Sequence, residues 1–275
     1  MRKQLPVRTT KEIESPRNSG EVQSLLRGLS LLECLADFDG APVGLNELAL
    51  RVGLSSSTTH RLLATLRSEG YVTRDRESNR YVLGHRVAGT AATILQRTSH
   101  LRAIARPHLE AIAAETGETT NLVVLDEVRS VYVDKVDGTH ALRMSMRVGN
   151  TFSAHTSASA KAILAFQPDE TSLKSIFADE PLRKFARNTI TEIRGFRSAL
   201  KEVVDVGYAI ESEEVEEGVS CIAAPLFGVN GVAIAAISVP GPTTRIMMPN
   251  PSRIGNLVSK HAFEISQLLG FKQRD

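Results

Sequence analysis

Residues 45–83 hold the pattern that most narrowly limits what this chain can fold into. Four apolar residues recur at the i, i+3, i+4 and i+7 positions of a helix: Leu45, Leu48, Ala49 and Val52. Gly53 can take the left-handed conformation that ends a helix, and Ser55 can cap the next helix with its hydroxyl. The sequence therefore predicts two helices joined by a tight turn, the second running from Ser56 to about Gly70.

A short hairpin is predicted directly after the second helix. Residues 71–74 and 80–83 read as two strands, and the polar residues 75–79 form the turn between them. In the second helix four residues are predicted to turn inward: Thr58, Leu62, Leu63 and Leu66. This leaves small hydroxyls and basic side chains at the exposed start of that helix, and arginines along the hairpin.

These features together favour a winged helix-turn-helix that binds duplex DNA, because the start of the second helix enters the major groove in such proteins. Hydroxyls and arginines suit the acceptors on phosphates and base edges. The predicted DNA contacts are Ser56, Ser57, Thr59, His60, Arg61, Arg67, Arg74, Arg76 and Arg80. Any one of them could instead belong to a polar helix start or be a solvated surface charge, so the prediction depends on the whole set.

The charge of the chain is divided unevenly along its length. The formal net charge is only +2, but residues 1–99 carry +4 and residues 100–275 carry −2. A basic front and a weakly acidic back fit DNA binding at one end and a different function at the other. A length of 275 residues is enough for two domains with their own cores.

Cysteine content and hydropathy bear on the location of the protein. The two cysteines, Cys34 and Cys221, lie far apart in sequence, which argues against a disulfide scaffold and fits a reducing cytoplasm. No apolar run approaches the roughly 20 residues of a membrane helix. The N-terminus lacks the apolar core of a secretory signal. We therefore expect a cytoplasmic protein with no membrane partner.

Four consecutive regions are predicted along the chain. They are a disordered tail over 1–20, a winged helix-turn-helix over 21–84, a linker helix over 85–100 and an effector-binding domain over 101–275. A helix over 22–38 is expected to bury five leucines beneath the DNA-reading helices: Leu25, Leu26, Leu29, Leu32 and Leu35. Pro107 is expected to open a further helix, since proline is tolerated best in the first turn.

Strand patterns dominate the back half of the chain. Two hairpins are expected, over residues 121–134 and 221–239, with another strand over 141–148. Helical periodicity marks three further segments: residues 157–166, 196–206 and 252–269. This succession indicates an α+β fold, in which helices flank an antiparallel sheet.

Many short motifs agree, in order, with one known family. In the front half they are residues 23–29, 45–53, 57–63, 70–72 and 81–84. In the back half they are residues 117–122, 147–149, 207–209, 217–219, 221–225, 237–238 and 241–242. By these motifs, residues 21–270 resemble the isocitrate-lyase-regulator (IclR) family of bacterial transcription factors. The resemblance implies a GAF-like effector domain, homodimers or homotetramers on pseudo-palindromic operator DNA, and control by a small metabolite.

The residues themselves suggest where such an effector would bind. The segment 155–157 leads into a helix whose start offers N–H donors to an anion, so a carboxylate effector is expected there. Carried over from the resembled family, the effector-binding residues are Ala158, Ser159, Glu211, Cys221 and Ser238.

The chain departs from the family at two positions near this site. Ala160 stands where the family usually has glycine, and Pro240 where it often has serine, which predicts a narrower and less polar site suited to an aromatic or longer acid. Four neighbouring side chains have two interpretations each. Arg143 and Arg147 could pair with a carboxylate or form structural salt bridges, and Met144 and Met146 could line the site or pack in the core.

Two other classes of function compete with this interpretation. A cysteine hydrolase could use Cys221 and His155, with Glu211 or Glu213 as orienter, but an inert thiol is the default in a run of buried-strand character. An architectural DNA binder would not need the strand-rich back half. A metal site from His155, Cys221 and a glutamate is a weak possibility, because no close ligand pair such as CxxC or HxxxH appears. We predict a non-enzymatic repressor or activator without metal or cofactor.

Overall fold

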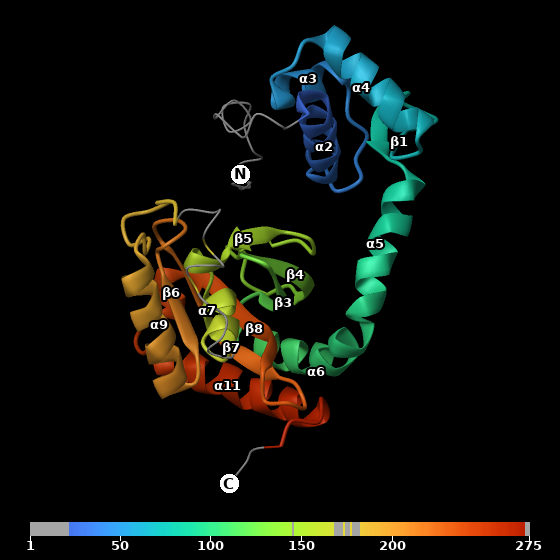
Figure 1. The fold of residues 1–275 in the computed structure, drawn as a ribbon. Coiled ribbons are helices and arrows are strands. Elements are labelled where there is room, and N and C mark those ends of the chain that lie inside the picture. Colours follow the sequence, from blue (N-terminus) through green and yellow to red (C-terminus); the bar gives the residue numbers. More distant parts are fainter. Residues whose placement is uncertain (1–21, 145, 168–172, 174–176, 178–181, 273–275) are drawn as a thin grey trace. The chain divides into compact units, whose positions relative to one another are not determined.

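The computed structural model describes residues 22–272, except 145, 168–172, 174–176 and 178–181. The predicted tail over 1–20 lies outside the described residues. The contacts divide the chain into two units, and the boundary between them in the sequence lies between Arg97 and Thr98. Figure 1 shows helices and a small hairpin in the first unit, and a larger sheet flanked by helices in the second.

The first unit has the predicted order of elements. It comprises α2 (Gln23–Ala36), α3 (Leu45–Val52), α4 (Ser56–Ser68), β1 (Val72–Arg74), β2 (Tyr81–Leu83) and α5 (His85–Arg97). Strands β1 and β2 pair antiparallel, and Val43 adds a bridge to Tyr81. A core of buried apolar side chains joins α2, α3, α4 and the hairpin, and includes Leu31, Leu48 and Leu63.

Helix α2 buries only part of the predicted face: Leu35 is in the core and Leu32 packs against it, as predicted. Leu25 and Leu29, expected to point inward, are 61% and 48% exposed, whereas Leu31 and Cys34 are fully buried. The helix is apolar on two adjacent sides, so periodicity alone does not decide which side meets the core. Within the first unit, the exposed side leaves an apolar stripe that also includes Val22.

The second unit is built on one six-stranded antiparallel sheet. Its strands are β3 (Thr120–Asp126), β4 (Arg129–Val136), β5 (Thr151–Ser153), β6 (Ala209–Ser212), β7 (Val219–Phe227) and β8 (Ala233–Pro242). They lie in the order β5-β4-β3-β8-β7-β6. The helical elements are α6 (Ser99–Thr116), η1 (Ala154–Thr156), α7 (Ala158–Leu164), α9 (Ile193–Val206), α10 (Thr243–Ile246) and α11 (Pro251–Leu268). The two predicted hairpins are confirmed.

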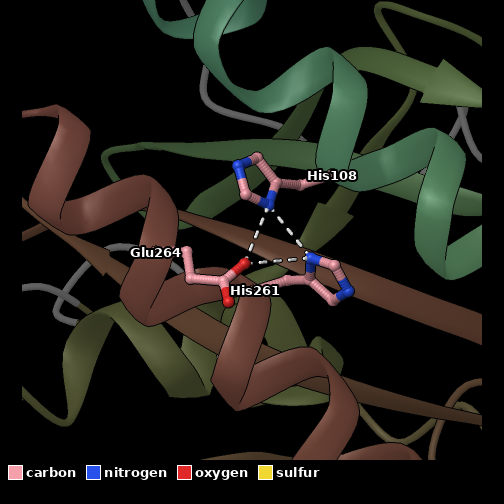
Figure 2. Close-up of side chains that lie close together, drawn as sticks. All are labelled: His108, His261 and Glu264. Atoms are coloured by element: carbon pink, nitrogen blue, oxygen red, sulfur yellow. Dashed lines mark hydrogen bonds and ion pairs between the residues drawn. The ribbon is translucent and has the colours of Figure 1, made fainter.

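Alternation along β7 separates the two faces of this sheet. Cys221 and Ala223 pack with residues of α7, whereas Ile222 and Ala224 join the large core with α6 and α11. Helices α7 and α9 therefore cover one face and α6 and α11 the other (Figure 1). Where α6 and α11 cross, His108 lies beside His261 and Glu264 (Figure 2).

Three local expectations for the back half need correction. Pro107 lies inside α6, which begins eight residues before it, rather than at its start. The predicted linker helix over 85–100 corresponds to α5, which ends at Arg97, and α6 begins at Ser99. The described residues of 141–148 form no strand: Ala141 and Leu142 lie in a bend, Val148 and Gly149 lie in a turn, and β4 pairs with β5 instead. Among the described residues, no helix combines the length and apolar character needed to span a bilayer.

Candidate functional site

The start of α4 has the properties expected of a DNA-reading surface. Gly53 ends α3 with a left-handed φ of 67°, and the Thr58 N–H donates to the Ser55 hydroxyl at 3.2 Å. The turn and the cap thus form as the sequence predicts. The side chains beyond the cap are exposed to solvent: Ser56, Ser57, His60, Arg61 and Arg67.

Thr59 departs from the prediction. Its side chain is 0% exposed, and its hydroxyl has no hydrogen-bond partner among the described residues. Thr58, predicted to point inward, is only half-buried. The buried stripe of α4 runs through Thr59 and Leu63, one turn apart, so it is rotated by about one residue from the predicted stripe. The expectation of an exposed Thr59 is wrong.

The arginines of the hairpin fall into two groups. Arg74 is half-buried and donates to Asn79 Oδ1 and to the Tyr81 hydroxyl, both at 3.0 Å. Its guanidinium also lies 5.1 Å from the centre of the Tyr81 ring. Arg74 therefore ties the hairpin together, whereas Arg76 and Arg80 extend into solvent.

The second unit gathers buried polar side chains on the sheet face that α7 covers. Asn121 of β3 lies opposite Ser238 of β8, and Glu211 of β6 lies opposite Cys221 of β7. Ser159, at the start of α7, is 1% exposed. Because α7 packs on β3, β7 and β8, these five side chains share one layer. We call them the polar cluster: Asn121, Ser159, Glu211, Cys221 and Ser238.

Several atoms of the polar cluster have no hydrogen-bond partner among the described residues. They are Asn121 Oδ1, Asn121 Nδ2, Ser159 Oγ and Ser238 Oγ, of which the last has only the Cys221 thiol, a weak hydrogen-bonding group, beside it. Buried polar groups in folded proteins are nearly always paired, and each unpaired one costs about 1–3 kcal/mol. Unpaired donors and acceptors from β3, β8 and α7, gathered in one layer, are the expected signature of a site that receives polar atoms of a ligand.

Beside the polar cluster lies a buried ion pair. Lys161 of α7 is 1% exposed; its ammonium donates to the Glu214 carboxylate and, at 3.3 Å, to the carbonyl of Ile210. Burial raises the pKa of Glu214, and the Lys161 charge opposes that shift. The positive charge of Lys161 is therefore already matched within the protein.

Glu211 holds the loop that follows β6. Its carboxylate accepts hydrogen bonds from the backbone N–H groups of Glu214, at 2.6 Å, and Val215, at 3.4 Å. Burial nevertheless raises the pKa of Glu211 to about 7, with a further contribution from the Glu214 charge. Glu211 can thus change its protonation state near neutral pH.

The geometry does not assemble the thiolate pair that a cysteine hydrolase would need. His155 Nδ1 pairs with Ser153 Oγ at 2.8 Å, and Nε2 pairs with the Arg183 carbonyl at 2.9 Å. Burial, reinforced by the Glu211 charge, raises the pKa of the Cys221 thiol well above its usual range. A protonated thiol whose predicted base, His155, is engaged with other groups is a poor nucleophile.

The residues predicted to shape the effector site do not all lie beside the polar cluster. The Ala160 methyl group packs with Phe196 and Leu200 of α9, so it does not narrow the polar cluster as expected. Met146 packs with Val123 and Tyr132, and Met144 lies against them. Pro240 lies opposite Cys221, as a donor-free neighbour of the polar cluster.

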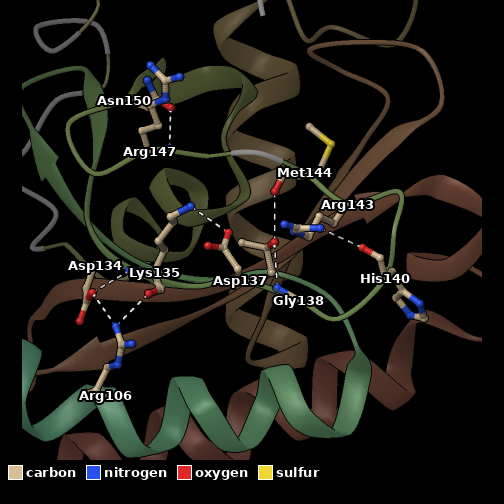
Figure 3. A network of polar contacts seen from close by, with 11 residues as sticks. Arg106, Asp134, Lys135, Asp137, Gly138, His140, Arg143, Met144, Arg147 and Asn150 are labelled. Carbon is tan, nitrogen blue, oxygen red and sulfur yellow. Dashed lines mark hydrogen bonds and ion pairs between the residues drawn. The ribbon is translucent and has the colours of Figure 1, made fainter. Parts of the chain in front are cut away.

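A network of polar contacts fixes the loop that carries Arg143 and Arg147 (Figure 3). The Thr119 hydroxyl donates to the carbonyl of Met144 at 3.1 Å, and the Arg147 N–H donates to Asn150 Oδ1 at 2.7 Å. Arg143 is exposed and donates to the carbonyl of His140 at 3.3 Å.

Sequence reasoning missed two residues of this region. Asn121 belongs to a motif of the resembled family, but it reads as an ordinary strand residue until its unpaired amide is seen. Lys161 reads as a helix-surface lysine, and only the fold shows that it is buried against Glu214. Ala158 is buried at the start of α7 and can contribute only backbone groups.

Comparisons with known proteins agree with both units. The family model described as "Bacterial transcriptional regulator IclR C-terminal" matches residues 92–267, and the "IclR helix-turn-helix domain" matches residues 24–76. The transcriptional repressor IclR of Escherichia coli K12 is 35% identical over 254 residues, which cover 92% of each chain. The DNA-binding transcriptional repressor YiaJ of the same strain is 35% identical over 266 residues, covering 95% of this chain and 93% of YiaJ.

Solved structures give the same result. The crystal structure of Thermotoga maritima IclR matches with a TM-score of 0.71 at 31% identity, covering 91% of this chain and 100% of that one. A putative transcriptional regulator, RHA06195 from Rhodococcus sp. RHA1, matches with a TM-score of 0.69 at 27% identity, covering 90% of this chain and 98% of that one.

A winged helix-turn-helix followed by a sheet domain with a buried polar cluster defines a DNA-binding transcriptional regulator with an effector domain. More specifically, the chain belongs to the IclR family of bacterial transcriptional regulators. The relatives are named as repressors and regulators and not as enzymes, which confirms the prediction of a non-enzymatic protein.

Proposed function

We propose that this regulator binds operator DNA as a homo-oligomer, dimer or tetramer, and that a small carboxylate held by the polar cluster changes its affinity for that DNA. The observation that carries the proposal is the set of buried, unpaired atoms on Asn121, Ser159 and Ser238. A ligand that paired with them would recover the free energy that their burial costs.

The charges of the site favour a ligand with one carboxylate. Lys161 is already neutralised by Glu214, so no spare cation awaits a second anionic group. The free donors are neutral: the Asn121 amide and the hydroxyls of Ser159 and Ser238. Helix α7 has only seven residues, so its dipole adds little and the side chains have to provide the selectivity.

The apolar surroundings favour an acid with an aromatic or longer aliphatic body. Val123 of β3, Tyr132 of β4 and Met146 of the following loop form a buried apolar group next to the polar cluster. Pro240 contributes no donor of its own where it faces Cys221. An apolar ligand body would pack here, while its carboxylate meets the unpaired amide and hydroxyls.

For DNA we propose contacts from the exposed members of the predicted set. They are Ser56, Ser57, His60, Arg61, Arg67, Arg76 and Arg80. Thr59 is left out because it is buried, and Arg74 because it is engaged within the hairpin. Two winged domains of an oligomer would contact half-sites about 34 Å apart, or a multiple of this. Ligand coupling of about 1–3 kcal/mol would change operator affinity roughly 5- to 150-fold.

The ligand half of the proposal is tested by a thermal-shift screen against aromatic and aliphatic monocarboxylic acids. We expect an acid that raises the Tm of the wild-type protein but not that of the Asn121→Leu, Ser238→Ala double variant. Ser198→Ala, at an exposed serine of α9, is the matched control and should behave as wild type. The proposal fails if the double variant binds the same acid with unchanged affinity.

The DNA half is tested by gel retardation with the region upstream of the protein's own coding sequence. Arg61→Ala should lose discrimination between this region and unrelated DNA, whereas Arg197→Ala, an exposed arginine of α9, should retain it. Wild-type binding should weaken steeply with salt, since arginine contacts to phosphates release counterions. Unaltered footprints with Arg61→Ala would remove this residue from the interface.

A further inference from the structure

A second group of chemically active side chains lies on the opposite face of the sheet from the polar cluster. His108 extends from α6, and His261 and Glu264 extend from α11 (Figure 2). His261 and Glu264 are three residues apart, which places them on the same side of α11. In the described part of the chain, this is the one group of histidine, cysteine and carboxylate residues whose ligand atoms converge closely enough to hold a metal ion.

The three ligand atoms form a compact triangle. His108 Nδ1 lies 2.9 Å from His261 Nδ1 and 3.4 Å from Glu264 Oε2, and His261 Nδ1 lies 3.6 Å from Glu264 Oε2. A point equidistant from three atoms at these separations is about 1.9 Å from each. Zinc binds imidazole nitrogen and carboxylate oxygen at about 2.0–2.2 Å, so an ion slightly above the plane of the triangle would reach all three ligands.

A purely structural hydrogen bond explains this arrangement less well. A hydrogen bond between the two Nδ1 atoms accounts for one edge of the triangle only. It does not explain why the Glu264 carboxylate lies close to both nitrogens. A cation in the centre contacts all three lone pairs at once. The imidazoles are 17% and 15% exposed and the Glu264 side chain is 40% exposed, so solvent reaches all three side chains.

We propose that His108, His261 and Glu264 bind one divalent first-row transition-metal ion, such as zinc, between α6 and α11. Two nitrogens and one oxygen suit zinc and its neighbours better than magnesium or calcium, which prefer oxygen ligands. The ion would link the helix that opens the second unit to the helix that closes it. Because the polar cluster lies on the other sheet face, this site is separate from the proposed carboxylate site.

The experiment titrates Zn²⁺ into untagged, chelator-stripped, full-length protein, in competition with a chromogenic chelator. We expect one ion per chain, and binding weakened by about tenfold or more in His108→Gln and in His261→Gln. His100→Gln, at an exposed histidine near the start of α6, is the matched control and should bind like wild type. Zinc should also raise the Tm of the wild type and of this control, but not that of the two ligand variants.

Glu264→Gln is the milder variant should either histidine variant fold poorly, because its side chain is the most exposed of the three. It keeps the shape of the side chain but loses the negative charge, so we expect weaker zinc binding with an unchanged Tm in the absence of metal. The proposal is overturned if zinc does not bind, or if it binds equally well to the wild type and to the three ligand variants.

Discussion

The recognition helix and the polar cluster use similar polar side chains in opposite settings. On α4 the serines and arginines that we propose for DNA contact are exposed to solvent. In the polar cluster Asn121, Ser159 and Ser238 are buried, and protein atoms leave them unpaired. A surface that reads a long polymer needs access, whereas a site for a small molecule needs enclosure. Several unpaired buried atoms gathered in one layer are therefore a stronger sign of a ligand than exposed charges are of DNA, whereas one such atom alone, as at Thr59, is not.

The largest expected effect comes from removing the cation beside the polar cluster. Lys161→Met leaves the buried Glu214 carboxylate without its partner, and breaking a buried pair in this way costs about 3–5 kcal/mol. Urea denaturation should show this loss, whereas Lys201→Met, at an exposed position of α9, should change little. Adding Glu214→Gln to Lys161→Met should recover part of the loss. An unchanged urea midpoint in Lys161→Met would contradict the burial of the Lys161–Glu214 pair.

The next effect concerns pH and the proposed carboxylate ligand. The pKa of Glu211 is about 7, so at pH 6 it is mostly protonated and at pH 8 mostly charged. A carboxylate ligand meets a repelling charge only at the higher pH, so its Kd should rise as pH increases through 7, by up to about tenfold per unit. Glu211→Gln should flatten this dependence in ligand titrations. An affinity that increases with pH would contradict the assignment.

Asn121 should show a smaller effect, and in opposite directions for stability and for binding. Asn121→Leu removes a buried amide whose oxygen and nitrogen are both unpaired, so the ligand-free protein should gain about 1 kcal/mol in its free energy of unfolding. The same change should abolish the Tm increase caused by the acid. Loss of stability without ligand would indicate that the amide already has partners in the free protein.

The smallest effect separates Thr59 from its exposed neighbours on α4. Thr59→Val removes a buried hydroxyl without a partner, so we expect a gain in stability below about 1 kcal/mol and unchanged operator binding. Thermal melts and gel retardation test the two parts. A loss of operator binding comparable to that of Arg61→Ala would return Thr59 to the DNA interface.

Much of the fold follows from the sequence, because turn chemistry and alternation are local signals. Gly53, Ser55 and the hairpins of the sheet behave as predicted. The errors arise where two faces of a helix are about equally apolar, so that only packing in the folded protein decides which one is buried. Helix α2 offers two apolar sides, and α4 could bury Thr58 or Thr59 at almost the same rotation.

The candidate sites depend more strongly on long-range contacts. Glu211, Cys221 and Ser238 were predicted from family motifs, whereas Asn121 was not, because its lack of partners is a property of the folded sheet. The group of His108, His261 and Glu264 was missed for a similar reason. Only the packing of α6 on α11 brings His108 to a pair of residues that sequence spacing alone does not distinguish.

The pairing of β3 with β8 has a consequence for the order in which the protein matures on the ribosome. These strands lie side by side in the middle of the sheet but far apart in sequence, and Asn121 faces Ser238 across them. At bacterial rates of synthesis, roughly 10 s separate the emergence of the two strands. The DNA-reading unit is complete before either. Each new chain therefore completes the unit that carries the proposed DNA contacts before the strands that carry the proposed ligand site can pair.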